Sequence, residues 1–120
     1  MKKILQVNFI INAKTPVLQA FQKQATRFGP NGDVKGLKWK IWLFNESDNS
    51  GGGIYLFEDQ ASVDAYLEGD IVKIIKSSPA LSNVEIKVFD FMPELTKISR
   101  GPIDWRSLIQ EYLLIEVHEC

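Results

Sequence analysis

Residues 37–58, LKWKIWLFNESDNSGGGIYLFE, contain two apolar runs that are joined by a polar, glycine-rich segment. Leu37 to Glu46 alternates as a β-strand does, with Leu37, Trp39, Ile41 and Leu43 on one face and Trp42 and Phe44 on the other. Asn45 to Gly53 has the composition of a hairpin connection, and Gly53 to Glu58 supplies a second strand. The segment therefore predicts two adjacent antiparallel strands.

Strands and helices are expected on both sides of this hairpin. Lys3 to Ile11 is apolar at every odd position from Leu5, which predicts a buried strand. Thr15 and Pro16 open a helix that should end at Gly29. The later elements are a helix capped by Asp59, a helical piece over Ile71–Lys76 and a strand over Val84–Met92. The order βαββαβ predicts an α+β, ferredoxin-like fold: an antiparallel sheet with helices on one face.

Composition limits the class of protein. The 120 residues suit one domain, which we assign to residues 1–100, with 101–120 as a C-terminal extension. A net charge of -1 gives no global field for nucleic acid or an anionic membrane, and no apolar run reaches the ~18 residues of a membrane span. Cys120 is the only cysteine and His118 the only histidine. We therefore expect a cytoplasmic protein without a metal site.

The two faces of the expected sheet differ in composition. The uniformly aliphatic face is expected to pack against the helices: Leu5, Val7, Phe9, Ile41, Leu43, Ile54, Leu56, Ile86 and Val88. The opposite face then carries large aromatics and a few polar groups: Gln6, Asn8, Ile10, Lys40, Trp42, Phe44, Tyr55, Phe57, Lys87, Phe89 and Phe91. So many exposed aromatics exceed the few hundred Å² of apolar patch that a soluble monomer usually tolerates. A second copy, packed sheet to sheet, would cover them in a dimeric α/β barrel.

The polar residues of that aromatic face have two interpretations. Gln6, Asn8, Lys40 and Tyr55 would face an apolar cavity, the usual composition of a small-molecule site. Alternatively, the aromatics form only the core of an obligate interface, and the polar groups bond to one another. Composition does not separate these interpretations.

Four motifs in the same order resemble the YdhR-like monooxygenase family of the dimeric α/β-barrel superfamily. The motifs are Gly36-Leu37 leading into Trp39-Lys40-Ile41-Trp42, then Gly52-Gly53-Ile54-Tyr55-Leu56-Phe57, Ala65-Tyr66-Leu67-Glu68 and Lys87-Val88-Phe89-Asp90. The first strand, Leu5-Gln6-Val7-Asn8-Phe9, is similar as well, and the resemblance covers about residues 1 to 100. It implies the βαββαβ fold and a homodimer.

The family's activity label rests on similarity to cofactor-independent oxygenases that act on polycyclic aromatic substrates. Such chemistry removes a proton from a phenol or anthrone and lets the carbanion react with oxygen, in a dry cavity with donors for the anion. The resemblance implies Asn8, Lys40 and Tyr55 as catalytic residues and Gln6, Trp42, Phe44 and Phe89 as substrate contacts. No base is evident, because a lysine acts as one only with a lowered pKa. The alternative is a non-catalytic module that binds or senses a small aromatic molecule.

Three further features of the sequence are the glycine run, the order of the elements and the C-terminal extension. Gly51-Gly52-Gly53 lies between two strands and lacks a following Gly-Lys-Ser/Thr, so a positive φ or a bulge at the hairpin is favoured over a phosphate loop. RNA-recognition domains share the strand order, but the third strand lacks their aromatic spacing. In the extension, a short helix followed by extended chain is expected from the spacing of Trp105, Leu108, Ile109, Tyr112 and Leu113.

Overall fold

The computed structural model describes residues 1–103, which divide between two units: Met1–Asp90 and a second unit that begins at Phe91. In the second unit, the helix α4 (Pro93–Ile98) begins at a proline, which suits the first helical turn because its missing N–H would be unpaired there. The expected helix around Trp105, as well as His118 and Cys120, lies outside the described residues.

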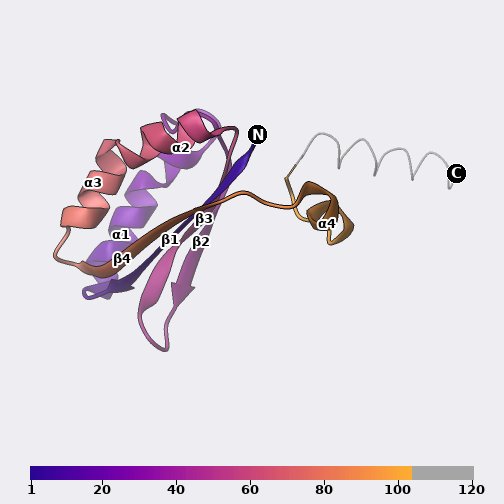
Figure 1. Ribbon diagram of the computed structural model, residues 1–120. Coiled ribbons are helices and arrows are strands. Elements are labelled where there is room, and N and C mark those ends of the chain that lie inside the picture. Colours follow the sequence, from indigo (N-terminus) through magenta and orange to yellow (C-terminus); the bar gives the residue numbers. More distant parts are fainter. Residues whose placement is uncertain (104–120) are drawn as a thin grey trace, which may run out of the picture. The chain divides into compact units, whose positions relative to one another are not determined.

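The first unit contains one four-stranded antiparallel sheet, seen in Figure 1. Its strands are β1 (Lys3–Ile11), β2 (Leu37–Asn45), β3 (Ser50–Phe57) and β4 (Leu81–Phe89), in the spatial order β2-β3-β1-β4. Three helical segments lie on one side of this sheet (Figure 1). The predicted α+β, ferredoxin-like architecture with helices on one face is confirmed.

The helices begin and end where local chemistry requires. The helices are α1 (Lys14–Gln24), which continues as a 3₁₀ turn, η1 (Ala25–Phe28), then α2 (Gln60–Leu67) and α3 (Asp70–Ser77). The Asp59 carboxylate accepts a hydrogen bond from the Ser62 backbone N–H at 2.8 Å and so caps α2, as expected. The expected Thr15 cap is wrong, since α1 begins at Lys14.

The strand register decides which residues face the helices. Leu5 of β1 pairs with Tyr55 of β3, which in turn pairs with Lys40 of β2. Directly opposed residues share a face of a sheet, so Lys40 and Tyr55 lie on the same side as the core residue Leu5. The residues that face the helices from β2 and β3 are therefore Lys40, Trp42, Phe44, Tyr55 and Phe57. The sequence-based assignment of these two strands was inverted: Ile41, Leu43, Ile54 and Leu56 lie on the face opposite the helices, where Leu56 is nevertheless buried.

The core between sheet and helices is rich in aromatic side chains. Its buried members are Leu5, Val7, Phe9, Ile11, Val17, Tyr55, Phe57, Val63, Tyr66 and Val72. On β1 and β4 the predicted faces are confirmed, because Val88 and Ile86 pair with Leu5 and Val7. Aromatic rings from both layers meet in this core. Phe21 of α1 contacts Phe9, and Phe28 of η1 contacts Trp42 and Tyr55.

The three glycines lie inside β3, and residues 46–49 form the hairpin turn instead, with Asn49 at φ 57°. Gly52 has φ +151°, and a Cβ on it would stand 1.8 Å from the carbonyl oxygen of Val7. Only glycine fits this close approach of β3 to β1. The positive φ was expected, but at the hairpin rather than within the strand.

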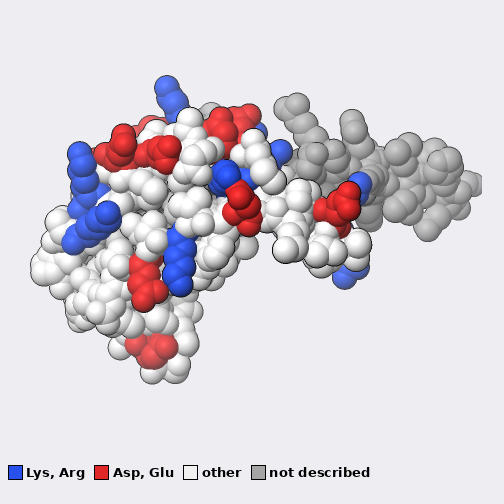
Figure 2. Space-filling view, in the orientation of Figure 1, with Lys and Arg blue, Asp and Glu red and all other residues white. Residues whose placement is uncertain are grey.

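Acidic and basic side chains are interspersed over the face shown in Figure 2, with no large area of one sign. This distribution agrees with the net charge of -1. No helix among residues 1–103 is long and apolar enough to cross a membrane.

Candidate active site

Lys40 extends from β2 into the aromatic core between the sheet and the helices. Its Nζ lies 3.3 Å from the ring centroid of Trp42, 3.8 Å from that of Phe28 and 4.8 Å from that of Tyr55. The three rings come from η1, β2 and β3, so three consecutive elements of the chain build one aromatic cage around the amine.

Gly53 makes room for the lysine. It pairs with Trp42 on β2 and with Val7 on β1, so it lies on the helix-facing side of the sheet. A Cβ on Gly53 would stand 2.9 Å from Cε of Lys40 and 3.0 Å from Cε1 of Tyr55, closer than real side chains approach. The absence of a side chain at Gly53 therefore lets the aliphatic part of Lys40 and the ring of Tyr55 pack together over the sheet.

The amine of Lys40 has no hydrogen bond and no ion pair within residues 1–103. Its polar interactions in this part of the chain are the cation–π contacts with the three rings. Burial among rings disfavours the charged form and lowers the pKa of Lys40 to about 7. Near neutral pH, a large fraction of this amine is unprotonated, so it can accept a proton or attack an electrophile.

A cavity of about 180 Å³ adjoins the amine, between α1, α3 and the sheet. Its lining is mainly apolar: Val17, Ala20, Phe21, Gln24, Phe28, Lys40, Trp42, Ile71, Ile74, Ile75, Ser78 and Leu81. Trp42 lies on an edge strand and stays 38% exposed, which leaves the cavity open to solvent beside it. Cavities of about 150 Å³ hold a benzene molecule, so this one suits a single aromatic ring.

Tyr55 is bonded to a second buried tyrosine. The hydroxyl of Tyr66 donates a hydrogen bond to the Tyr55 hydroxyl over 3.1 Å. Burial raises the pKa of Tyr55 to about 12, and burial together with the Tyr55 contact raises the pKa of Tyr66. Both phenols therefore stay neutral at physiological pH, so of these groups only Lys40 is suited to act as a base.

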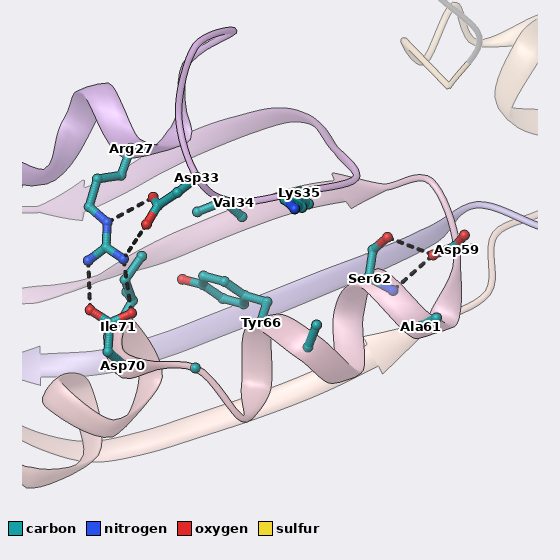
Figure 3. Close-up of a pocket in the computed structure, with 12 residues that line it drawn as sticks. Arg27, Asp33, Val34, Lys35, Asp59, Ala61, Ser62, Tyr66, Asp70 and Ile71 are labelled. Atoms are coloured by element: carbon teal, nitrogen blue, oxygen red, sulfur yellow. Dashed lines mark hydrogen bonds and ion pairs between the residues drawn. The ribbon is translucent and has the colours of Figure 1, made fainter.

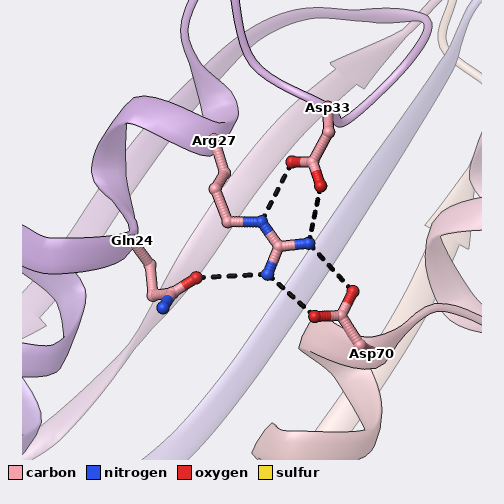
Figure 4. Close-up of polar contacts among 4 residues, drawn as sticks. All are labelled: Gln24, Arg27, Asp33 and Asp70. Carbon is pink, nitrogen blue, oxygen red and sulfur yellow. Dashed lines mark hydrogen bonds and ion pairs between the residues drawn. The ribbon is translucent and has the colours of Figure 1, made fainter.

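A second, larger hollow of about 370 Å³ is lined in part by Tyr66 and does not include Lys40 (Figure 3). Arg27 crosses one end of it and bonds to Asp33 and Asp70, each through two nitrogen–oxygen contacts of 2.8 and 2.9 Å (Figure 4). At the other end, Ser62 bonds to Asp59. Because these charged groups are already bonded to protein partners, we place the candidate chemistry at Lys40 rather than in the larger hollow.

The predicted site residues divide between the two faces of the sheet. Lys40, Trp42 and Tyr55 come together on the helix side, and Phe44 shares their face without lining the cavity; its ring lies 5.4 Å from Nζ of Lys14. Gln6, Asn8 and Phe89 lie on the uncovered face, where Gln6 Nε2 donates to Asn8 Oδ1 over 3.5 Å and Phe89 is 44% exposed. The placement of the whole set on one uncovered face was therefore wrong.

The residues of α1 and η1 that cover the site were not predicted from the sequence. Phe28 covers the amine, and Phe21 contacts Trp42 with ring centroids 5.5 Å apart. Phe21 and Phe28 lie seven residues apart, a spacing that places both on one face of the helix expected after Thr15 and Pro16. Aromatic residues on an inward helix face opposite Lys40, Trp42 and Tyr55 were the signal that these strand positions point at the helices.

Comparison with known proteins identifies the family. The family model described as "Putative mono-oxygenase ydhR" matches residues 4–102. The chain belongs to the YdhR family. This confirms the predicted resemblance, and it makes the protein a member of a monooxygenase family. No curated protein matches the chain.

Solved structures support the same fold for this YdhR-family chain. SnoaB, a cofactor-independent oxygenase from Streptomyces nogalater, superposes with a TM-score of 0.60 at 19% identity, covering 76% of this chain and 93% of SnoaB. MupZ from Pseudomonas fluorescens gives 0.55 at 20% identity, with coverage of 88% and 84%. The heme-degrader MhuD from Mycobacterium tuberculosis gives 0.54 at 11% identity, with coverage of 74% and 95%. At these identities, the likeness shows the fold.

Proposed function

We propose that this protein is a cofactor-independent monooxygenase that oxidises a small phenolic or anthrone-like aromatic molecule in the cavity beside Lys40. The observation that carries the proposal is an amine without a hydrogen-bonded or ionic partner in the described chain, in an aromatic cage that opens onto an apolar cavity. The YdhR family membership supports the reaction class, and the fold of SnoaB is consistent with it.

The first step is a proton transfer. Neutral Lys40 removes a proton from the activated carbon or phenol, and the resulting ammonium stays beside the new anion. In a cavity lined by apolar side chains, the attraction between these two charges is stronger than it would be in water. The amine thus supplies both the base that the sequence did not reveal and the positive charge opposite the developing anion.

The second step uses molecular oxygen. The carbanion transfers electrons to O₂ and forms a carbon–oxygen bond, which gives a peroxide anion, and the Lys40 ammonium returns its proton to that peroxide. For an anthrone CH₂ group, loss of the remaining C–H proton and cleavage of the O–O bond give a carbonyl and water. The balance is CH₂ plus O₂ to C=O plus H₂O, with Lys40 regenerated as the neutral amine.

The other proposed residues have supporting roles. Trp42 and Phe28 hold the aromatic ring of the substrate by their faces, and Tyr55 holds the lysine stem in place. Asn8, Gln6 and Phe89 are not part of this proposal, because the sheet separates them from the cavity. The cavity accommodates one aromatic ring, so the remaining rings of an anthrone would extend through its opening beside Trp42.

Oxygen consumption tests the proposal. An oxygen electrode would follow purified protein, free of metal and flavin, with a panel of hydroquinones and anthrones across pH 5 to 9. We expect uptake above buffer that rises with pH around 7, and a loss of at least about 100-fold in Lys40→Met, the usual scale of a missing base.

Lys38→Met is the matched control, because Lys38 is an exposed lysine on the same strand. It should keep full uptake. Binding of the panel compounds without oxygen uptake would leave the second hypothesis, a non-catalytic module that binds small aromatic molecules. Uptake that survives Lys40→Met would remove Lys40 from the mechanism.

A further inference from the structure

We propose that Lys40 forms a reversible imine with aldehydes or ketones that carry a single aromatic ring, so that the cavity is also a carbonyl-binding site. The proposal does not depend on oxygen chemistry. It rests on the position of the amine, the size of the cavity and the nature of its walls.

The position of Lys40 differs from that of other lysines in the described chain. Lys3, Lys14 and Lys38 each pair with a carboxylate (Asp90, Glu46 and Glu58), and the side chains of Lys23, Lys35, Lys73, Lys76 and Lys87 are exposed to solvent. Lys40 has no such partner within residues 1–103, and it points inward from a strand where an apolar residue would pack at lower cost. An unpaired buried amine costs stability, so its presence favours a chemical role over a structural one.

The cavity suits an aryl carbonyl compound. Its volume of about 180 Å³ accommodates one ring with a short substituent, and its walls are mainly aliphatic and aromatic. These apolar walls offer water few hydrogen-bond partners, which disfavours imine hydrolysis. The rings of Trp42 and Phe28, 3.3 and 3.8 Å from Nζ, would stabilise the iminium cation through their faces.

The covalent step balances without any further reactant. The Nζ lone pair attacks the carbonyl carbon, a C–N bond forms, and the oxygen is protonated to give a carbinolamine. Loss of that hydroxyl together with a proton releases one water molecule and leaves the C=N bond. Hydrolysis reverses both steps and restores the free amine, which is neutral in a useful fraction because burial lowers the pKa of Lys40 to about 7.

Reductive trapping tests the proposal. The native protein would be treated with benzaldehyde and cyanoborohydride at pH 7, digested, and mapped by mass spectrometry for benzyl-lysine. An ordinary solvated lysine has a pKa near 10.4 and holds less than about 0.1% neutral amine at this pH, so we expect Lys40 to be labelled about 100-fold faster than Lys38. The labelling rate should rise with pH and level off above about 7.

Two controls separate the cavity from the amine alone. Lys40→Met should lose the selective label, while Lys38→Met should keep it. If Lys40→Met fails to fold, urea-unfolded wild-type protein serves instead, because unfolding should abolish the preference for Lys40. Labelling spread evenly over the lysines of the native protein would overturn the proposal, as would an unchanged preference in urea. Selective labelling without oxygen uptake would leave this proposal standing and reject only the oxygenase.

Discussion

At the residue scale, Lys40 dominates the chemistry of this molecule because several neighbours combine to desolvate it. Gly53 removes the side chain that would otherwise displace the lysine stem, and the rings of Trp42 and Phe28 take the place of water around the amine. No carboxylate among residues 1–103 offsets that loss of hydration. The result is a polar group held at a cost to folding, as functional residues often are.

The cost should appear in the pH dependence of stability. Unfolded Lys40 titrates near 10.5 and folded Lys40 at about 7, so between these values the unfolded chain binds one more proton and stability rises with pH. Below pH 7, the full cost of burying the amine is present. Lys40→Met removes this cost, because a thioether packs in the cage without charge.

We therefore expect Lys40→Met to be more stable than wild type by about 2 kcal/mol at pH 6, which is less than the full shift implies because the lysine side chain is not completely buried. The difference should shrink toward pH 10. Urea titrations of both proteins at three pH values measure it. Equal stability at all three values would show that the amine stays charged and hydrated.

At the element scale, the sequence predicted what forms but not which way it faces. β1 was predicted with its observed ends, and its odd positions are buried as expected. Both faces of β2 are apolar, so alternation alone does not tell which face packs against the helices. The charged side chain of Lys40 favoured solvent exposure of its own face, and that prediction was wrong. The pairing of β3 with β1 determines which face packs against the helices. Because Leu5 lies opposite Tyr55, the aromatic residues of β2 and β3 face the core. Register is a long-range property that a local pattern does not contain.

The 3₁₀ turn η1 carries Phe28 over the amine, and Arg27 holds this turn in place. Its guanidinium joins η1 to Asp33 in the following loop and to Asp70 at the start of α3, and it lowers the pKa of both carboxyl groups (Figure 4). A planar fork can bond two carboxylates in this way, whereas an ammonium group cannot. Arg27 is thus a positioning residue for the Phe28 wall.

Arg27→Lys should loosen η1 and open the cage while the sheet stays intact. Hydrogen exchange followed by mass spectrometry should show faster amide exchange in residues 25–36, and the selective labelling of Lys40 by benzaldehyde should fall several-fold. Lys35→Met is the matched control, since it removes a positive charge from the same hollow without breaking these bonds. Unchanged exchange in Arg27→Lys would show that packing alone fixes Phe28.

At the scale of the whole molecule, three helical segments cover one side of the sheet in the unit Met1–Asp90 and leave the other side open (Figure 1). That open side carries Ile41 at 49% exposure and Phe89 at 44%, beside the bonded pair Gln6 and Asn8. Its residues differ from those predicted, because β2 and β3 were inverted; its apolar side chains lie beside Lys87 and Glu85, which pair with Gln6 and Asn8. We propose that a second copy covers it, and that the polar pair belongs to this interface rather than to the cavity.

A homodimer built on this face should be visible by light scattering at micromolar concentration. Ile41→Lys would place an ammonium in the apolar interface, where an unpaired charge costs several kcal/mol, so we expect at least about a 100-fold weaker dimer. Ile74→Lys is the matched control: Ile74 is 58% exposed but lies on α3, across the sheet from the proposed interface. A wild-type monomer would reject the dimer. Dissociation by Ile74→Lys but not by Ile41→Lys would instead place the contact on the helical side, where the partner would cover the cavity beside Lys40.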